Sequence, residues 1–240
     1  MSDMNTTGPG WEGAPPDVDL GRVWRAVATE VWRLQPSWLE RCAARLLGSP
    51  GLARALLTTP SLLVAWLIST VVVLAVGAAA TVGTGLPLVA LLAPAVAGAG
   101  IAYAYGPGTD PAWELSCSMA VSDRMVLLVR ALAVFAVNAA LGLAASAASG
   151  LAASVTFGWL VPMTAVSALA LAAATVARSA NVGVGAGMAG WAITVLAAQA
   201  SSRQWSAAIT DWALVPPYLI FAAGCAAVVI FVTRVPKGAS

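Results

Sequence analysis

Histidine is absent from the 240 residues of this chain, and Lys237 is its only lysine. A P-loop needs a lysine after its glycine-rich turn to hold phosphates, so the chain cannot hydrolyse ATP by that route. Metal sites and acid–base catalysis depend strongly on histidine, and a Ser–His protease pair is equally excluded. We therefore expect no enzyme, and no catalytic, cofactor-binding or metal-binding residue in this chain.

Charge is also scarce. Only 9% of the residues are charged and 60% are hydrophobic, with a mean hydropathy of +0.87. Soluble domains carry roughly a quarter charged residues, so this composition suits a surface that faces lipid. The cysteines at positions 42, 117 and 225 lack the spacing of a metal or redox motif and do not indicate a disulfide framework. A net charge of +2 does not point to nucleic acid as a partner.

The charges divide the first 60 residues into two parts. Residues 1–19 contain glycine, proline and four acids but no base, which predicts a disordered acidic leader rather than a signal peptide. Residues 20–58 contain six arginines against two glutamates. This second part is therefore basic and is set apart from the apolar chain that follows.

Two amphipathic helices are predicted in residues 20–60, as cytoplasmic connecting helices at the membrane surface. Pro36 ends the first, and Ser37 with Glu40 caps the second, whose apolar stripe includes Trp38 and Cys42. Arginine and tryptophan on an amphipathic helix suit the lipid headgroup region. The interfacial residues are expected to be Trp24, Arg25, Trp32, Arg33, Trp38 and Arg41. The alternative is a small cytosolic helical hairpin that packs on a partner protein.

Six apolar stretches follow, each near the 20 or so residues that a membrane-spanning helix needs. They cover approximately residues 62–82, 86–105, 125–148, 157–177, 182–200 and 213–232. The predicted fold is an all-α integral membrane protein, with about six transmembrane helices in residues 61–240 behind the interfacial segment. Five spans are the main alternative.

Basic residues predict the orientation in the membrane, because cytoplasmic loops carry an excess of them. With six spans, one side receives Arg54, Arg124, Arg130, Arg178, Arg234 and Lys237. The other side receives Arg203 alone. This distribution supports six spans over five, and it predicts a cell-membrane protein with both termini in the cytoplasm.

The loop between the second and third stretches carries the most informative motif. Asp110 followed by Pro111 is a helix start, because it supplies a capping acceptor and then a fixed φ. A cytoplasmic helix is therefore predicted over residues 110–120. A surface helix of this kind also occurs in membrane proteins of other functions.

This pattern resembles the permease subunits of ABC-2 type transporters from about residue 20 onward. The matching residues are Asp110, Pro111, Glu114 and Leu115, and then Ser122, Arg124, Leu127 and Arg130. The resemblance implies that residues 110–120 form a coupling helix on a separate ATP-binding subunit, which holds the ATP-Mg. The expected contact residues are Asp110, Pro111, Trp113, Glu114, Leu115 and Arg124. It also implies that two permeases pair to form the pathway of an exporter.

Polar residues inside the predicted spans are few, the main ones being Asn138, Thr164 and Thr175. Asn138 is expected to hydrogen-bond a neighbouring helix, with a place on a substrate path as the alternative. No acid lies at mid-membrane, which argues against a proton- or sodium-coupled transporter. Gly183, Gly187 and Gly190 predict close helix packing, either within the chain or at a dimer seam.

The last external loop, residues 198–212, is too polar to span the membrane. Trp205, Trp212 and Tyr218 suggest an outer aromatic belt. The loop is either an ordinary exposed segment or a set of short re-entrant helices. Prolines are expected to kink the second, fourth and sixth spans near their ends, at positions 87, 94, 162, 216 and 217.

Two functions remain after these exclusions. The first is the permease subunit of an ATP-driven exporter, as the resemblance implies. The alternative is a non-transporting membrane regulator or anchor that recruits a cytosolic partner through residues 20–58.

Overall fold

The computed structural model of the chain describes residue 19 and residues 21–26, 38–48, 60–103, 123–150 and 152–234. Within these ranges the regular elements are helices, and no strand is present. Five helical segments there are long and apolar enough to cross a membrane. The all-α fold predicted from hydropathy is therefore confirmed, and the chain is a polytopic helical membrane protein.

The five segments coincide with five of the six predicted apolar stretches. They are formed by α4 (Pro60–Thr84), α7 (Asp123–Ala148), α8 (Ala153–Gly158) with α9 (Leu160–Ala177), α10 (Ala180–Ser202), and η1 (Trp212–Leu214) with α12 (Val215–Val232).

The remaining stretch forms α5 (Leu88–Tyr103), an apolar helix of only 16 residues. At 1.5 Å per residue it is about 24 Å long, against about 30 Å for a bilayer core. It contacts α4, α7, α9 and α10, and its alanines at positions 90, 93 and 97 are buried. Because protein surrounds this helix, its length is not set by the thickness of the surrounding lipid.

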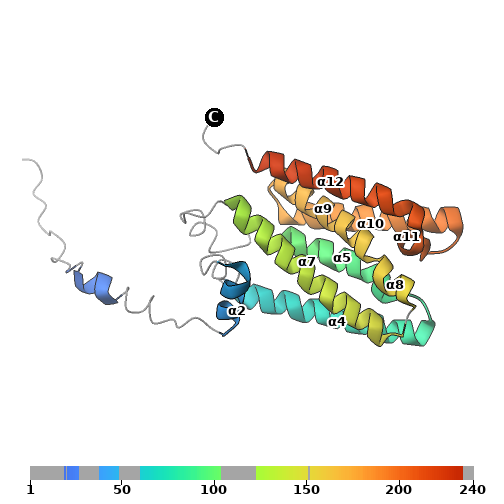
Figure 1. Ribbon diagram of the computed structural model, residues 1–240, viewed down its shortest axis with the longest axis horizontal. Coiled ribbons are helices and arrows are strands. Elements are labelled where there is room, and N and C mark those ends of the chain that lie inside the picture. Colours follow the sequence, from blue (N-terminus) through green and yellow to red (C-terminus); the bar gives the residue numbers. More distant parts are fainter. Residues whose placement is uncertain are drawn as a thin grey trace, which may run out of the picture.

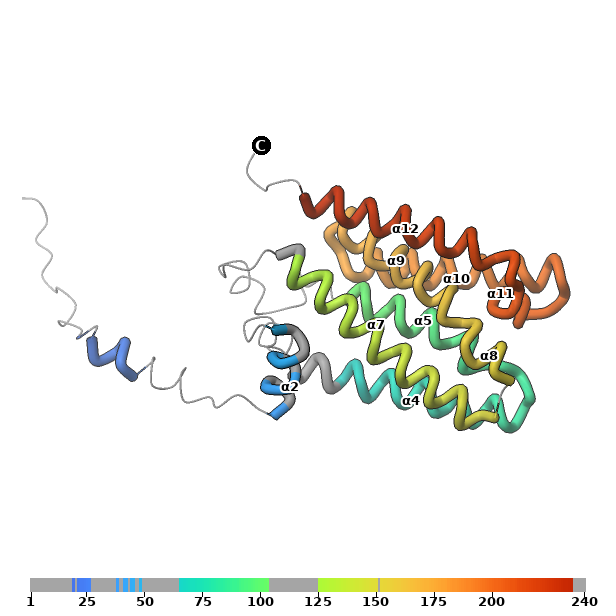
Figure 2. The backbone as a smooth tube through the Cα atoms, in the orientation of Figure 1, coloured from blue at the N-terminus to red at the C-terminus, as the bar shows by residue number. Residues whose placement is uncertain are grey.

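Successive membrane helices run in alternating directions, so the bundle has two ends (Figures 1 and 2). We call one the basic end; it carries Tyr103, Asp123, Arg178 and Arg234. The opposite end carries residues 85–87, 149–150, 152 and 203–214, which connect the helices there. The helix α5 also runs from the opposite end to the basic end, although it is short.

Proline affects these helices less uniformly than predicted. Pro94 lies inside α5, but Pro87 precedes that helix and Pro216 and Pro217 lie in the first turn of α12. Proline is tolerated there because the first N–H groups of a helix have no partner within it. The expected kinks at these three positions are therefore absent. In the fourth stretch the helix breaks at Trp159, just before Pro162.

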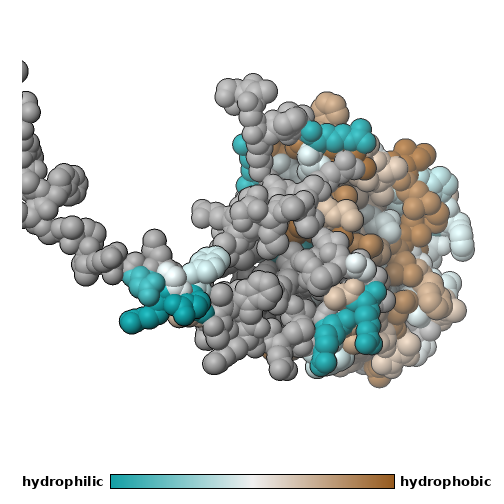
Figure 3. Space-filling model, turned by 60° about the vertical axis from the view of Figure 1, so that its left-hand side comes forward, coloured by the Kyte–Doolittle hydropathy of each residue, from teal (hydrophilic) through white to brown (hydrophobic). Residues whose placement is uncertain are grey.

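The interior and the surface of the bundle are both apolar. Trp159, Met163, Trp191 and Ile209 belong to one buried cluster. On the outside, large hydrophobic side chains are exposed along α4 and α12, including Ile220, which is 73% exposed. Figure 3 shows hydrophobic residues along the flank of the bundle and hydrophilic residues near its basic end. This is the surface expected of a protein whose sides face lipid.

Candidate functional site: the basic end and the polar interior of the bundle

The segment predicted to couple to a partner is attached to the bundle at the basic end. The described chain stops at Tyr103, the last residue of α5, and resumes at Asp123, the first residue of α7. The predicted contact residues Asp110, Pro111, Trp113, Glu114 and Leu115, and the side chain of Arg124, lie outside the described residues.

Arginine side chains distinguish the two ends. Arg178 and Arg234 are exposed at the basic end, and Arg130 is half-buried about two turns into α7. Arg203 is exposed at the opposite end. The structure thus places Arg178 and Arg234 at one end of the bundle and Arg203 at the other, as the distribution of basic residues in the sequence predicted.

The first interfacial helix is described only over residues 21–26. The backbone N–H of Arg22 donates to Asp19 Oδ1 at 3.0 Å, so Asp19 caps this helix. Trp24 is 71% exposed, and Arg25 Nε donates to the Gly21 carbonyl oxygen at 3.0 Å. Asp19 was expected in the acidic leader, although an Asp just before a helical pattern is a capping signal. The other predicted residues of this helix, Trp32 and Arg33, lie outside the described residues.

The second interfacial helix is α2 (Trp38–Leu47). Trp38, Arg41, Cys42 and Arg45 are all exposed. Their spacing of three or four residues places them on one face of the helix. Trp38 and Cys42 were expected on an apolar stripe, but they share the exposed face of α2 with Arg41 and Arg45. An indole beside two guanidinium groups is suited to the headgroup region of a membrane.

Two of the polar residues in the spans bond their own helix. Thr164 Oγ1 donates to the Val161 carbonyl oxygen at 2.6 Å, and Thr175 Oγ1 donates to that of Ala172 at 2.8 Å. Hydroxyl donors that bond backward within a helix need no partner elsewhere. The two threonines therefore offer no donor to a polar path through the bundle.

Asn138 behaves differently from the prediction. It is 3% exposed, and its Nδ2 donates to the Val134 carbonyl oxygen at 2.8 Å in its own helix, α7. The expected hydrogen bond to a neighbouring helix is not formed. Asn138 Oδ1 is buried and accepts no hydrogen bond from the described part of the chain. The amide nitrogen of Asn138 thus has a hydrogen-bond partner, and its amide oxygen has none among the described residues.

Two tryptophans without a predicted role, Trp66 and Trp159, pack about one turn before and one turn after this asparagine along α7. Trp66 Nε1 lies 2.5 Å from the point where a Cβ on Gly100 would lie, and Val134 Cγ1 lies 3.2 Å from that point. The ring of Trp159 comes within 2.6 Å of the corresponding point on Gly142. Both indoles therefore fit against backbone that carries no side chain. In the sequence both tryptophans lie within the first five residues of an apolar stretch, where a position at the membrane interface is expected, so no signal marked them as core residues.

The small face of α10 packs within the chain. A Cβ on Gly183 would lie 2.6 Å from the Ala170 carbonyl oxygen in α9, and one on Gly187 would lie 3.0 Å from Ala170 Cβ. Gly190 would meet Leu169 Cδ2, also in α9, at 2.7 Å. These glycines let α9 and α10 approach closely.

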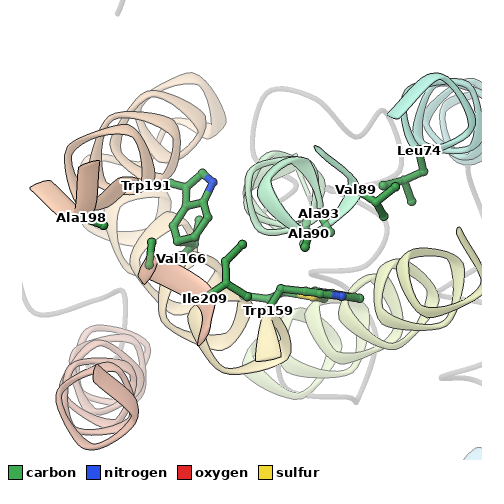
Figure 4. Close-up of a cluster of buried hydrophobic side chains, with 12 residues drawn as sticks. Leu74, Val89, Ala90, Ala93, Trp159, Val166, Trp191, Ala198 and Ile209 are labelled. Carbon is green, nitrogen blue, oxygen red and sulfur yellow. The ribbon is translucent and has the colours of Figure 1, made fainter. Parts of the chain in front are cut away.

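The external loop after α10 folds back onto the bundle. Its short helix α11 (Ala207–Thr210) buries Ala208 and Ile209, and Figure 4 shows Ile209 between the indoles of Trp159 and Trp191. Tyr218 Oη donates to the Ala208 carbonyl oxygen at 2.9 Å, so this half-buried side chain holds α11 instead of forming a belt. Trp205 and Trp212 are exposed, as a belt requires.

Comparison with known proteins adds no identification, since no model of a protein family, no curated protein and no solved structure matches the chain. Among the described residues, no group of three or more His, Cys, Asp or Glu side chains could hold a metal ion. The features on which a function can be argued are thus the helix arrangement, the basic end and the buried polar groups.

Proposed function

We propose that this chain is the membrane-spanning subunit of an ATP-driven exporter of the ABC-2 type. It would form the translocation pathway with a second copy of itself and work with a separate ATP-binding subunit that holds ATP-Mg. The observation that carries the proposal is topological. The segment with the Asp110–Pro111 and Glu114 motif joins α5 to α7 at the end of the bundle that also carries Arg178 and Arg234.

The position of α5 gives this segment mechanical access to the bundle. A displacement of the segment acts directly on the ends of α5 and α7, and α5 contacts α4, α7, α8, α9 and α10. At the same end, Tyr103 Oη lies 3.5 Å from Asn181 Oδ1, where α5 meets the start of α10. A force applied at the basic end therefore reaches the centre of the bundle through α5.

In this arrangement the basic end of the bundle faces the cytoplasm, because basic segments that flank membrane helices are retained on that side. Both termini of the chain then lie in the cytoplasm. The exposed Trp–Arg faces of residues 21–26 and α2 would lie along the cytoplasmic surface of the membrane. The partner subunit would then meet residues 110–120 from the cytoplasm.

The test is co-purification of the full chain with a nucleotide-binding partner, followed by measurement of the partner's ATPase rate. We expect Glu114→Arg to abolish both the complex and the stimulation of ATP hydrolysis. Arg203→Glu, a charge reversal at the opposite end, should leave both intact. An unchanged complex with Glu114→Arg would remove the coupling role from this segment.

The second candidate is a membrane regulator that recruits a cytosolic protein through residues 20–58. The exposed indoles of Trp24 and Trp38, each beside an arginine on its helix, favour it. Deletion of residues 1–58 separates the two functions. A permease lacking this segment should still assemble with its partner, whereas a regulator should lose its function entirely.

A further inference from the structure

One face of α7 carries two buried polar side chains, Asn138 near the middle of the helix and Ser146 in its last turn. Asn138, Gly142 and Ser146 follow one another at intervals of four residues, so they lie on the same face. We call these three residues the polar face of α7. Asn138 is 3% exposed and Ser146 is fully buried. Neither Asn138 Oδ1 nor Ser146 Oγ has a hydrogen-bond partner in the described ranges.

The orientation of the Asn138 amide is fixed by its one hydrogen bond. The carbonyl oxygen of Val134 can only accept, so the side-chain atom that bonds it must be the nitrogen. The oxygen Oδ1 is therefore left as an acceptor that requires a donor. A hydroxyl such as that of Ser146 can both donate and accept.

Two indole side chains lie within about one helical turn of Asn138 along α7, one on each side of it. Trp66 Nε1 lies beside Val134, one turn before Asn138, and the Trp159 ring lies against Gly142, one turn after it. Both indole nitrogens are buried and donate to no group that the structure describes. Trp159 itself is 0% exposed, and Figure 4 shows its indole lying flat within the core.

Along α7, positions one helical turn apart are spaced closely enough for a hydroxyl bridge. Side chains one helical turn apart have Cβ atoms about 5–6 Å from each other. A hydroxyl that accepts from an N–H and donates to a carbonyl oxygen spans about the same distance. A buried water typically makes about three hydrogen bonds to polar groups that are otherwise unsatisfied.

We propose that the polar face of α7, with the indoles of Trp66 and Trp159, is a binding site for water within the membrane bundle. Water molecules accept from the two indole N–H groups and donate to Asn138 Oδ1, and Ser146, about two turns beyond Asn138, continues the site. The glycine contacts favour water over a larger hydroxyl compound, because Trp66 and Trp159 already lie within 2.5 and 2.6 Å of the Cβ positions of Gly100 and Gly142. The proposal does not depend on transport.

The experiment uses the full chain in lipid nanodiscs, deuterated and labelled with ¹⁵N-tryptophan. Cross-relaxation between the water resonance and each indole N–H is then measured by NMR. Trp66→Phe and Trp159→Phe assign the two signals. We expect both indoles to show nuclear and rotating-frame Overhauser effects of opposite sign to water, as for a bound molecule.

The chain supplies its own controls. Trp191 Nε1 donates to the Leu91 carbonyl oxygen at 2.7 Å, so its signal should show no water contact. Trp205 and Trp212 are exposed, so their indole N–H groups should show contact with the surrounding water. Asn138→Leu, which keeps a similar size but removes the acceptor, should remove the water signals of Trp66 and Trp159 and leave that of Trp191 unchanged.

Three results would overturn the proposal. The first is the absence of water contacts at Trp66 and Trp159 in the unmodified chain, which decides the matter even if Asn138→Leu does not fold. The second is contact of these indoles with lipid protons in place of water, which would assign the site to a lipid hydroxyl. The third is water contacts that persist unchanged in folded Asn138→Leu.

Discussion

The indole nitrogen of Trp191 in α10 donates a hydrogen bond of 2.7 Å to the carbonyl oxygen of Leu91 in α5. This bond joins residues a hundred positions apart in the sequence. It lies beside Pro94, whose missing N–H leaves the carbonyl of Ala90 without its usual helical donor. The indole thus ties α10 to the part of α5 whose own hydrogen-bond ladder is interrupted.

Replacement of Trp191 by phenylalanine should destabilise the bundle. The change removes the donor to Leu91 and shortens a side chain that is 5% exposed. We expect a loss of about 1–2 kcal/mol, since a lost buried hydrogen bond costs about that much. Unfolding of the full chain in mixed micelles measures it. Trp212→Phe is the matched control and should have little effect, because Trp212 is 83% exposed.

Alanine should have different effects at two glycines of α10, Gly183 and Gly185. A Cβ on Gly183 would lie 2.6 Å from the Ala170 carbonyl oxygen and 2.7 Å from Ala174 Cβ, so α9 and α10 must move apart. We expect Gly183→Ala to destabilise the chain by about 1–3 kcal/mol, as overpacking does.

Gly185 lies in the same helix, with no atom within 4 Å of a Cβ placed there. Gly185→Ala should therefore be neutral or stabilising by up to about 1 kcal/mol, because alanine favours the helix. Equal effects of the two substitutions in the same unfolding assay would contradict the close α9–α10 contact.

Hydropathy located the long helices because an apolar run of membrane length has few alternatives to a helix. It could not determine that α5 is short and enclosed, since apolar residues that face lipid and apolar residues that face protein look alike in sequence. Pro216 and Pro217 were predicted to kink a span, but they lie in the first turn of α12. Which turn a proline occupies depends on where the helix starts. The helix α12 starts at Val215, directly after η1.

The polar interior was predicted only in part. Asn138 was recognisable as a polar residue in an apolar run, but the sequence did not show that it would bond its own helix at Val134 rather than a neighbouring helix. Trp66 lies against Gly100, and Trp159 against Gly142, and no periodicity within one helix indicates such pairs. The folding of α11 onto the core was likewise left open, because Ile209 follows a polar segment that looks like an exposed loop.

Arg203 at the end of α10 is held in a left-handed conformation, with φ of 59°. Its N–H donates to the Gln199 carbonyl oxygen at 3.0 Å, which closes the helix. A residue with a Cβ pays about 1–2 kcal/mol for this conformation, and glycine does not. We expect Arg203→Gly to stabilise the chain by about 1 kcal/mol against unfolding, whereas Arg203→Ala should not.

The crossing of the membrane by α5 can be tested with single cysteines. The background replaces Cys42, Cys117 and Cys225 by serine, and a thiol reagent that cannot enter cells is added from outside. Leu86→Cys and Tyr103→Cys report the two ends of α5, both at exposed positions. Arg203→Cys and Arg234→Cys report the two ends of the bundle.

If α5 crosses with the other helices, the reagent labels Leu86→Cys and Arg203→Cys in intact cells. Tyr103→Cys and Arg234→Cys should be labelled only after the cells are opened, because the basic end then faces the cytoplasm. Labelling of Leu86→Cys and Tyr103→Cys from the same side would mean that α5 does not cross the membrane. The segment between α5 and α7 and the connection before α5 would then lie on the same side of the membrane. The coupling role proposed for Glu114 would lose its topological support.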